Sequence, residues 1–173
     1  MGYNVTGRTG SVLDVRADGA VPLYKADEPE VFSWTSATAN IDANDTAILV
    51  TNDSTSKHLH ITDMYVYSDV PSALDFFCPV YATITGTAIT GICLNRASTT
   101  VAPVTALGDT TGDTLANIFA TLYSNETATD QHGVWLKLNG LLTLGYHDSA
   151  AIAIVAASAV ANAAIIGYFH DNH

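Results

Sequence analysis

His58 and His60 are the residues whose types and spacing most directly suggest chemistry. They stand two positions apart in an alternating segment, so a β-strand would place both imidazoles on one face with their Cα atoms about 7 Å apart. Such a pair can bind a metal ion, because neutral imidazole is a common metal ligand. However, Lys57 precedes the pair and Asp63 follows it, and no Glu stands shortly after it. We therefore expect the solvent face of a half-buried strand here.

Two further segments carry side chains that could bind a cation. Gly108–Asp113 offers two carboxylates on an open backbone, which is compatible with a calcium loop, but its spacing does not match an EF-hand and favours a flexible surface loop. The terminal segment His170–His173 is expected to be solvated. No nucleotide-binding glycine loop, nucleophile elbow or HExxH motif occurs. The sequence thus predicts a protein that is not an enzyme and has no catalytic, cofactor or metal site.

Cys78 and Cys93 are too few for a disulfide framework. Both stand in strand-like apolar runs, where a free cysteine is commonly buried. Two interpretations are open, namely two buried free thiols or a single cross-strand disulfide. No CxxC spacing indicates zinc.

The formal net charge of −11 restricts the partners. A field of that sign repels nucleic acid and anionic membrane surfaces, and it favours a basic protein partner. Only 13% of the residues are charged, which leaves a surface dominated by Thr, Ser, Asn, Gly and Ala. Such a surface is typical of a domain that packs against copies of itself or against another protein.

Residues 1–30 differ from the rest of the chain, because apolar residues are sparse there and three of the six basic residues occur there. A disordered tail is one interpretation. The other, which we favour, is an extended arm that lies on a neighbouring subunit or partner. Its basic residues would then make the docking contacts, and they are Arg8, Arg16 and Lys25.

Residues 31–173 form a succession of short runs rich in β-branched and aromatic residues, separated by turn clusters. This rhythm predicts one all-β domain, a jelly-roll-like β-sandwich of about 8–10 antiparallel strands. Asn139-Gly140 is the strongest hairpin signal between two runs. The expected strands are Val31–Thr35, Thr46–Thr51, Lys57–Ser68 (with Leu59, Ile61 and Asp63 on one face), Phe76–Thr85, Ala88–Leu94, Leu115–Tyr123, Val134–Leu138, Leu141–Tyr146 and two C-terminal runs.

Two segments can also be written as helices, Leu115–Tyr123 and the Ala-rich end of the chain. The stretch Ala150–Phe169 is the one candidate for a membrane span, but Ser158 and Asn162 interrupt it and no basic residue flanks it. Alternation there would place Ile152 and Ile154 on one face of a strand, with Ala151, Ala153 and Val155 on the other. We therefore expect two core strands and no membrane segment.

The C-terminal pattern LxLGYHDSAAIAIVAA…AAIIGYFHD, which follows the Asn139-Gly140 turn, resembles small jelly-roll virion proteins of tailed bacteriophages, of the head decoration or cement type. The resemblance covers about Val31 to Asp171. It implies a structural protein that is made in the host cytoplasm and then binds the outside of an assembled phage head as a homotrimer. Its partners would be its own copies and the major capsid protein or a neighbouring virion protein.

Two other hypotheses are kept open. The first is a carbohydrate- or receptor-binding module of a phage tail or fibre, in which exposed aromatic side chains would stack on sugars. The candidates for that role are Trp34, Tyr65, Tyr67, Tyr123 and Trp135. The second is a cupin-like metalloenzyme centred on His58 and His60.

Overall fold

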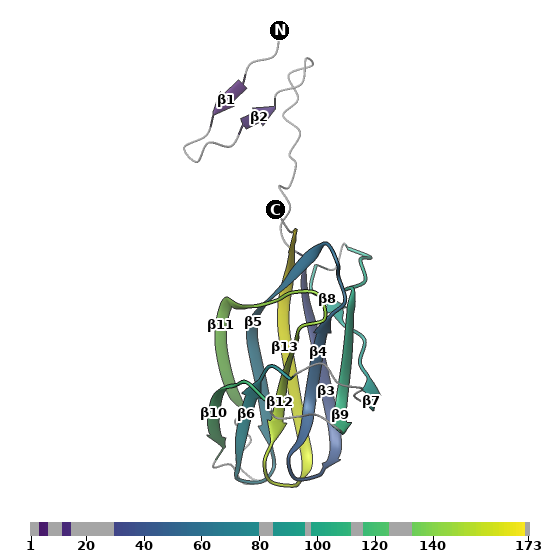
Figure 1. Ribbon diagram of the computed structural model, residues 1–173, viewed down its shortest axis with the longest axis vertical. Coiled ribbons are helices and arrows are strands. Elements are labelled where there is room, and N and C mark those ends of the chain that lie inside the picture. Colours follow the sequence, from purple (N-terminus) through teal and green to yellow (C-terminus); the bar gives the residue numbers. More distant parts are fainter. Residues whose placement is uncertain are drawn as a thin grey trace.

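The computed structural model describes residues 4–6, 12–14, 30–79, 85–95, 98–111, 116–124 and 133–171 (Figure 1). These residues form strands and connections, with no helix among them. The strands are β1 (Asn4–Thr6), β2 (Val12–Asp14), β3 (Val31–Ile41), β4 (Asp45–Asn52), β5 (Lys57–Ser68), β6 (Ser72–Phe77), β7 (Thr85–Ala88), β8 (Ile92–Cys93), β9 (Val104–Thr111), β10 (Ile118–Ser124), β11 (Val134–Leu144), β12 (Ser149–Ile154) and β13 (Ser158–Asp171).

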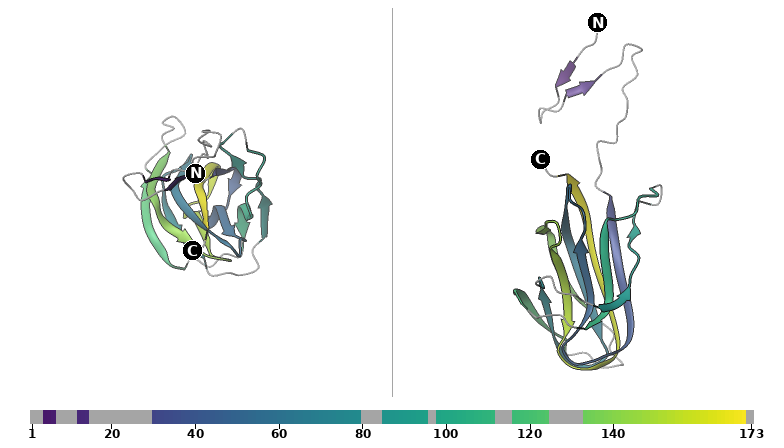
Figure 2. Two further views of the ribbon diagram at one scale, coloured as in Figure 1. Left: turned by 90° about the horizontal axis from the view of Figure 1, so that it is seen from above. Right: turned by 45° about the vertical axis from the view of Figure 1, so that its right-hand side comes forward.

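Two antiparallel sheets pack face to face as a jelly-roll-like β-sandwich (Figure 2). The six-stranded sheet has the order β10-β6-β12-β4-β9-β7, and the five-stranded sheet has the order β11-β5-β13-β3-β8. The strand pairs β3–β4, β5–β6, β10–β11 and β12–β13 each pass from one sheet to the other. The predicted fold class is therefore confirmed. The insertion β7–β9 lengthens both sheets at one side, while β1 and β2 form a separate antiparallel pair.

One hydrophobic core fills the space between the sheets. Trp34 is its largest side chain, and its ring stacks on that of Phe32 with centroids 6.0 Å apart. Phe76 and Ile152 meet them from the six-stranded sheet. The alternation of buried and exposed positions along β5 and β11 follows from this packing, because only one face of the five-stranded sheet contacts the core.

Strand β12 is buried along its whole length because both of its faces are covered. Ile152 and Ile154 point into the main core, whereas Ala151 and Ala153 join a second buried cluster with Leu49 and Phe77. The predicted division between bulky and small residues is confirmed. Ala151 pairs with Leu49 of β4 on one side and with Phe77 of β6 on the other, and these larger side chains complete the cluster.

The predicted hairpin at Asn139-Gly140 is wrong. Both halves of β11 pair with β5. Lys137 pairs with Asp63 and Leu142 pairs with Ile61, so four residues of β11 lie between these two partners. Asn139 and Gly140 do have the positive φ angles of a tight turn, 52° and 78°. The turn chemistry therefore produces a bulge within one strand, because β5 offers a partner on both sides of it.

A second bulge shifts the facing of side chains in β5. The pairing with β13 skips Thr62, so Met64 rather than Asp63 follows Leu59 and Ile61 into the core. The predicted inward position of Asp63 is wrong for this reason. One inserted residue reverses the facing of every position after it.

Several boundaries also differ from the expected ones. Strand β3 continues to Ile41, β6 begins at Ser72, and the run Ala88–Leu94 is divided between β7 and β8. Both segments that could be written as helices contain strands, namely β10, β12 and β13. Among the residues that the structure describes, no helix has the length and hydropathy needed to cross a membrane.

Candidate functional site

His58 and His60 lie on the outer face of the five-stranded sheet, as expected from their spacing. The His60 ring stacks on that of Tyr168, with centroids 5.1 Å apart and planes at 11°. Its Nδ1 lies 3.3 Å from the carbonyl oxygen of Gly140 and 3.1 Å from Oγ1 of Thr143. These contacts connect β5 to β13 and β11, so His60 helps to hold the three strands together.

A third imidazole joins this face. His170 stands opposite His58 in the pairing of β13 with β5, and its ring centroid is 6.1 Å from that of His60. Within the described ranges, no group of three His, Cys, Asp or Glu side chains is placed so that it could hold a metal ion. The imidazoles of His58, His60 and His170 therefore lie on one polar face of the sheet.

The expected loop Gly108–Asp113 begins inside a strand, so the prediction of a surface loop is wrong for its first four residues. Gly108–Thr111 belong to β9 and pair with β4 and β7. Asp109 has a positive φ of 51°, at the point where the pairing with β7 is irregular. Gly112 and Asp113 lie outside the described residues.

Cys78 and Cys93 are both free thiols, so no cross-strand disulfide forms, but neither is fully buried as the other interpretation expected. Both are half-buried; Cys78 follows the end of β6 in the six-stranded sheet, whereas Cys93 lies in β8 of the five-stranded sheet. Burial raises the pKa of the Cys78 thiol, and the nearby charge of Asp148 raises it further. The thiol is therefore protonated and weakly nucleophilic at neutral pH.

The structure separates the aromatic candidates into two classes. Trp34 and Tyr67 are buried. Tyr123 is exposed on β10, and Trp135 is exposed on the outer face of β11. Trp135 lies against Tyr65, with ring centroids 5.2 Å apart and planes at 49°. Among these five candidates, Trp135 with Tyr65 combines exposure with a defined arrangement of two rings.

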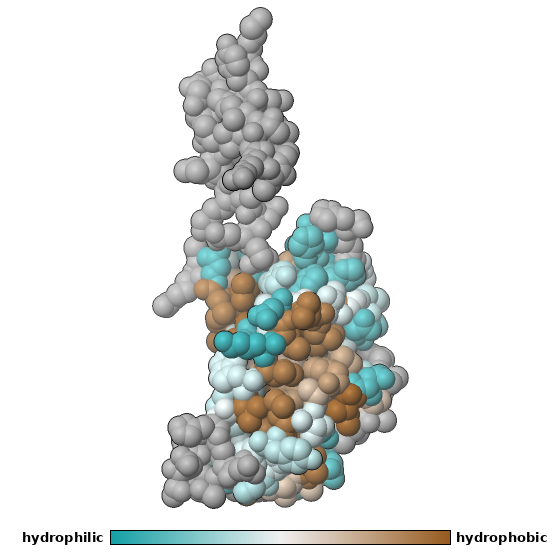
Figure 3. All heavy atoms as spheres, turned by 90° about the vertical axis from the view of Figure 1, so that its left-hand side faces the viewer, coloured by the Kyte–Doolittle hydropathy of each residue, from teal (hydrophilic) through white to brown (hydrophobic). Residues whose placement is uncertain are grey.

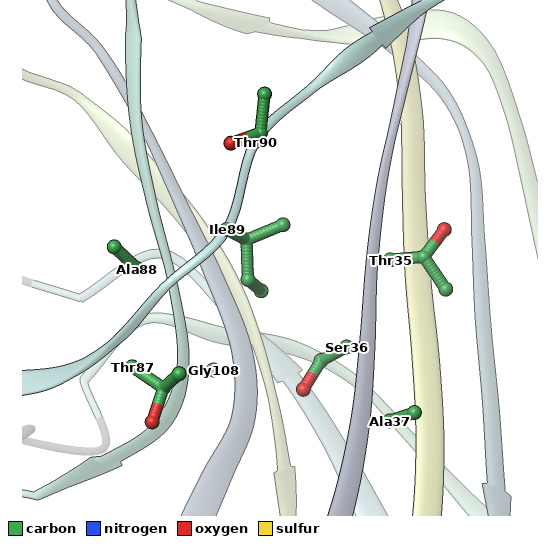
Figure 4. Close-up of a pocket in the computed structure, with 8 residues that line it drawn as sticks. All are labelled: Thr35, Ser36, Ala37, Thr87, Ala88, Ile89, Thr90 and Gly108. Atoms are coloured by element: carbon green, nitrogen blue, oxygen red, sulfur yellow. The ribbon is translucent and has the colours of Figure 1, made fainter.

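A cavity of about 420 Å³ opens between β3 and β7 (Figure 4). All of its lining residues are uncharged and four carry hydroxyl groups; they are Thr35, Ser36, Ala37, Thr87, Ala88, Ile89, Thr90 and Gly108. A Cβ at Gly108 would come within 2.5 Å of the Ser36 hydroxyl oxygen, so glycine lets β9 lie close to β3. The lining can donate and accept hydrogen bonds, but it contains no acid or base.

An apolar side, which was not expected from the sequence, lies on one side of the sandwich (Figure 3). Strands β10 and β11 end their respective sheets on the same side of the sandwich. Their core-facing side chains are only partly buried, and further apolar side chains beside them are exposed. We define the apolar side by Ile118, Phe119, Ala120, Leu122, Leu136, Leu138, Leu141 and Leu142. The alternating leucines of β11 are a sequence signal for this surface, but only the structure shows that they are partly uncovered.

Arg8, Arg16 and Lys25, the predicted docking residues of the arm, lie outside the described residues. Comparisons of the chain with protein-family models, with curated proteins and with solved structures found no match. The residues and geometry of the chain itself must therefore support any functional proposal.

Proposed function

We propose that this chain is a structural virion protein, a decoration protein that assembles with copies of itself on the outside of a phage head. The observation that carries the proposal is the apolar side of β10 and β11 (Figure 3). Leu141, Ile118 and Phe119 on this side are 86%, 45% and 41% exposed. Contiguous exposed apolar patches on a folded protein commonly mark protein–protein interaction sites.

Charge supports a second copy of the chain as the occupant of the apolar side. The protein is strongly acidic, yet β10 and β11 contain a single charged residue, Lys137. Two copies can therefore meet through these strands without bringing carboxylates together. An acidic protein also suits the outside of a DNA-filled shell, because the DNA inside the shell would repel its carboxylates.

Self-assembly would serve the proposed function through mass action. An oligomer that binds the assembled shell, and not its dissociated subunits, shifts the equilibrium toward the shell. Joining several copies strengthens that binding, because the second contact forms at a high effective concentration.

The mass of the purified protein in solution, measured by light scattering, tests the proposal. We expect an oligomer, with a trimer as the predicted form. Leu141→Glu should shift the mass to that of the monomer, because it places a carboxylate in the centre of a contact between acidic copies. Leu141 is 86% exposed, so the fold of the single chain should not depend on it.

Val101→Glu is the matched control, because Val101 is 81% exposed but lies between β8 and β9, away from the apolar side. This variant should keep the mass of the unmodified protein. A monomeric unmodified protein, or equal masses for the two variants, would contradict self-assembly through the apolar side.

A further inference from the structure

One edge of the five-stranded sheet is open beside β3. Strand β3 pairs with β13 along its length, but on its other side β8 pairs only with Phe32 and Ser33. From Trp34 to Ile41, none of the strands that the structure describes lies on this side of β3. Backbone groups at such an edge can pair with a strand of another chain.

One hydrogen bond shows which backbone groups face the open edge. The N–H of Leu94 donates to the carbonyl oxygen of Val31 at 2.7 Å, so the backbone groups of Val31 point away from β13. Successive residues of a strand direct these groups to alternate sides. The N–H and carbonyl groups of Thr35 and Ala37 therefore point to the open edge, whereas those of Ser36 point to β13.

The cavity of Figure 4 lies along this edge, because the chain between β7 and β8 diverges from β3 there. A Cβ at Gly91 would come within 2.3 Å of the ring nitrogen of Trp34, so the chain crosses this ring closely. At Ile89 it belongs to the other sheet, since the N–H of Ile89 donates to the carbonyl oxygen of Ala106. Figure 4 shows the Thr35 side chain pointing away from the cavity, so Thr35 lines it with its backbone.

The cavity has the size of a missing piece of strand. A residue of a packed strand takes about 160 Å³, from a rise of about 3.3 Å, a strand spacing of about 4.8 Å and a sheet spacing of about 10 Å. The volume of about 420 Å³ therefore has room for about two to three residues. Across the cavity, all four residues of β7 are exposed, so a strand added beside β3 would cover one face of β7.

The pair of strands β1 and β2, which we call the ribbon, belongs to neither large sheet. Each of its strands has three residues, and an isolated two-stranded sheet is marginally stable in water. Pairing with a larger sheet would stabilise the ribbon. Residues 15–29 connect it to the sandwich and could span up to about 50 Å when fully extended, which is enough to reach a neighbouring copy.

The start of β3 favours a neighbouring copy as the recipient of the ribbon. Glu30 hydrogen-bonds to the Thr100 hydroxyl, and Leu94 pairs with Val31 on the side of the open edge. Strand β3 runs from this point toward Thr35. The ribbon of the same chain would therefore have to turn back past Leu94 to reach the open edge, whereas the ribbon of another copy can approach it directly.

We propose that the ribbon of a second copy adds to the open edge of β3 and pairs with the backbone of Thr35 and Ala37. This inference rests on the proposed self-assembly, because strands of three residues can hold only where the apolar side already keeps two copies at a high effective concentration. Arg8 stands between β1 and β2 in the sequence and Arg16 follows β2, so pairing through these strands does not use them.

Amide hydrogen exchange, followed by NMR in the full-length protein, tests the proposal. The Thr35 and Ala37 amides should exchange at least about tenfold more slowly in the oligomer than in the Leu141→Glu monomer, because only the oligomer offers them hydrogen-bond partners. The Ser36 amide is the internal control. It faces β13 and should exchange slowly in both proteins.

Ala37→Pro separates the open edge from the apolar side. Proline removes the N–H that faces the open edge and leaves the pairing with β13 in place. Light scattering should still find an oligomer, while the Thr35 amide should exchange as fast as in Leu141→Glu. Leu13→Pro, which disrupts β2, should speed exchange at Thr35 in the same way. Circular dichroism checks the fold of both variants.

Three outcomes would overturn the addition of a ribbon from a second copy. They are fast exchange at Thr35 and Ala37 in an unmodified oligomer, slow exchange that persists in the Leu141→Glu monomer, and exchange at Thr35 that Leu13→Pro leaves unchanged. The first result would leave self-assembly through the apolar side standing. A monomeric unmodified protein would instead contradict self-assembly, and this inference with it.

Discussion

Asn52 shows how one buried side chain joins the two sheets of the sandwich. Its amide donates to the carbonyl oxygens of Lys57 and Leu144, each at 2.9 Å, and its side-chain oxygen accepts from the backbone N–H of Ser54. Leu144 ends β11 and Lys57 begins β5, whereas Asn52 ends β4 in the other sheet. The side chain therefore positions the end of the sandwich from which the proposed arm leaves, since Val31 and Tyr168 pair there.

Replacing Asn52 with alanine should lower the free energy of unfolding by about 2–3 kcal/mol. The loss arises because two carbonyl groups and one backbone N–H lose their partner in a buried place. Urea denaturation measures the change. Asn162→Ala, on the half-buried outer face of β13, should change stability by less than about 1 kcal/mol. An equal effect of the two substitutions would show that Asn52 is not the connection described.

At the scale of the strand, the bulge in β11 determines what the outer face presents. The excursion at Asn139 and Gly140 brings the Gly140 carbonyl oxygen to His60 and the backbone beneath Tyr168. It also places Leu141 in an exposed position beside the core-facing leucines. One irregular segment thus contributes both to the contacts of His60 and to the apolar side.

Gly140→Ala should destabilise the protein by about 1–2 kcal/mol, because a positive φ of 78° is unfavourable for alanine and its Cβ would lie 3.1 Å from the Tyr168 hydroxyl. Asn139→Gly provides the comparison. It relieves the same kind of backbone strain at φ 52° and should leave stability unchanged or slightly higher. Thermal unfolding of both variants measures this difference, and a stable Gly140→Ala protein would argue against the bulge.

At the scale of the whole molecule, charge is distributed unevenly along the chain. Half of the six basic residues and five of the seventeen acidic ones stand in the first 30 positions, so charged residues of both signs are concentrated there. We infer that the first 30 residues dock the protein on its partner and that the sandwich supplies the rigid body. The contacts of the described sandwich begin at Glu30, which hydrogen-bonds to the Thr100 hydroxyl at 2.7 Å.

Deleting residues 1–28 should therefore leave the sandwich folded and abolish binding to phage heads that lack the protein. Replacing Arg8, Arg16 and Lys25 with alanine should also weaken binding. The loss of affinity should be larger at low salt than at high salt, because exposed charges are screened as ionic strength rises. Cosedimentation with heads measures binding, and circular dichroism checks the fold. Unchanged affinity of the truncated protein would exclude the arm as the docking element.

Much of the architecture was predictable because local patterns carry it. Alternation placed Leu59 and Ile61 inside, and the Ala–Ile alternation of β12 predicted which of its residues face the main core. The bulge at Thr62 was not predictable, since an inserted residue depends on the partner strand rather than on its own neighbours. The same applies to Asn139-Gly140, where local preference produced the turn angles but β5 decided that no hairpin forms.

By itself, the sequence determined the class of this protein: an all-β sandwich with a strongly acidic composition and an Ala-rich end that forms core strands. Only the tertiary structure decided which aromatic side chains are available. Trp34 and Trp135 both stand in alternating runs, yet the first is buried between the sheets and the second faces outward on an edge strand. The physical reason is that alternation gives the two faces of a strand, whereas burial depends on which strands lie beside it. In the same way, β10 and β11 stand at the ends of their sheets, and their partly buried apolar side chains form the apolar side.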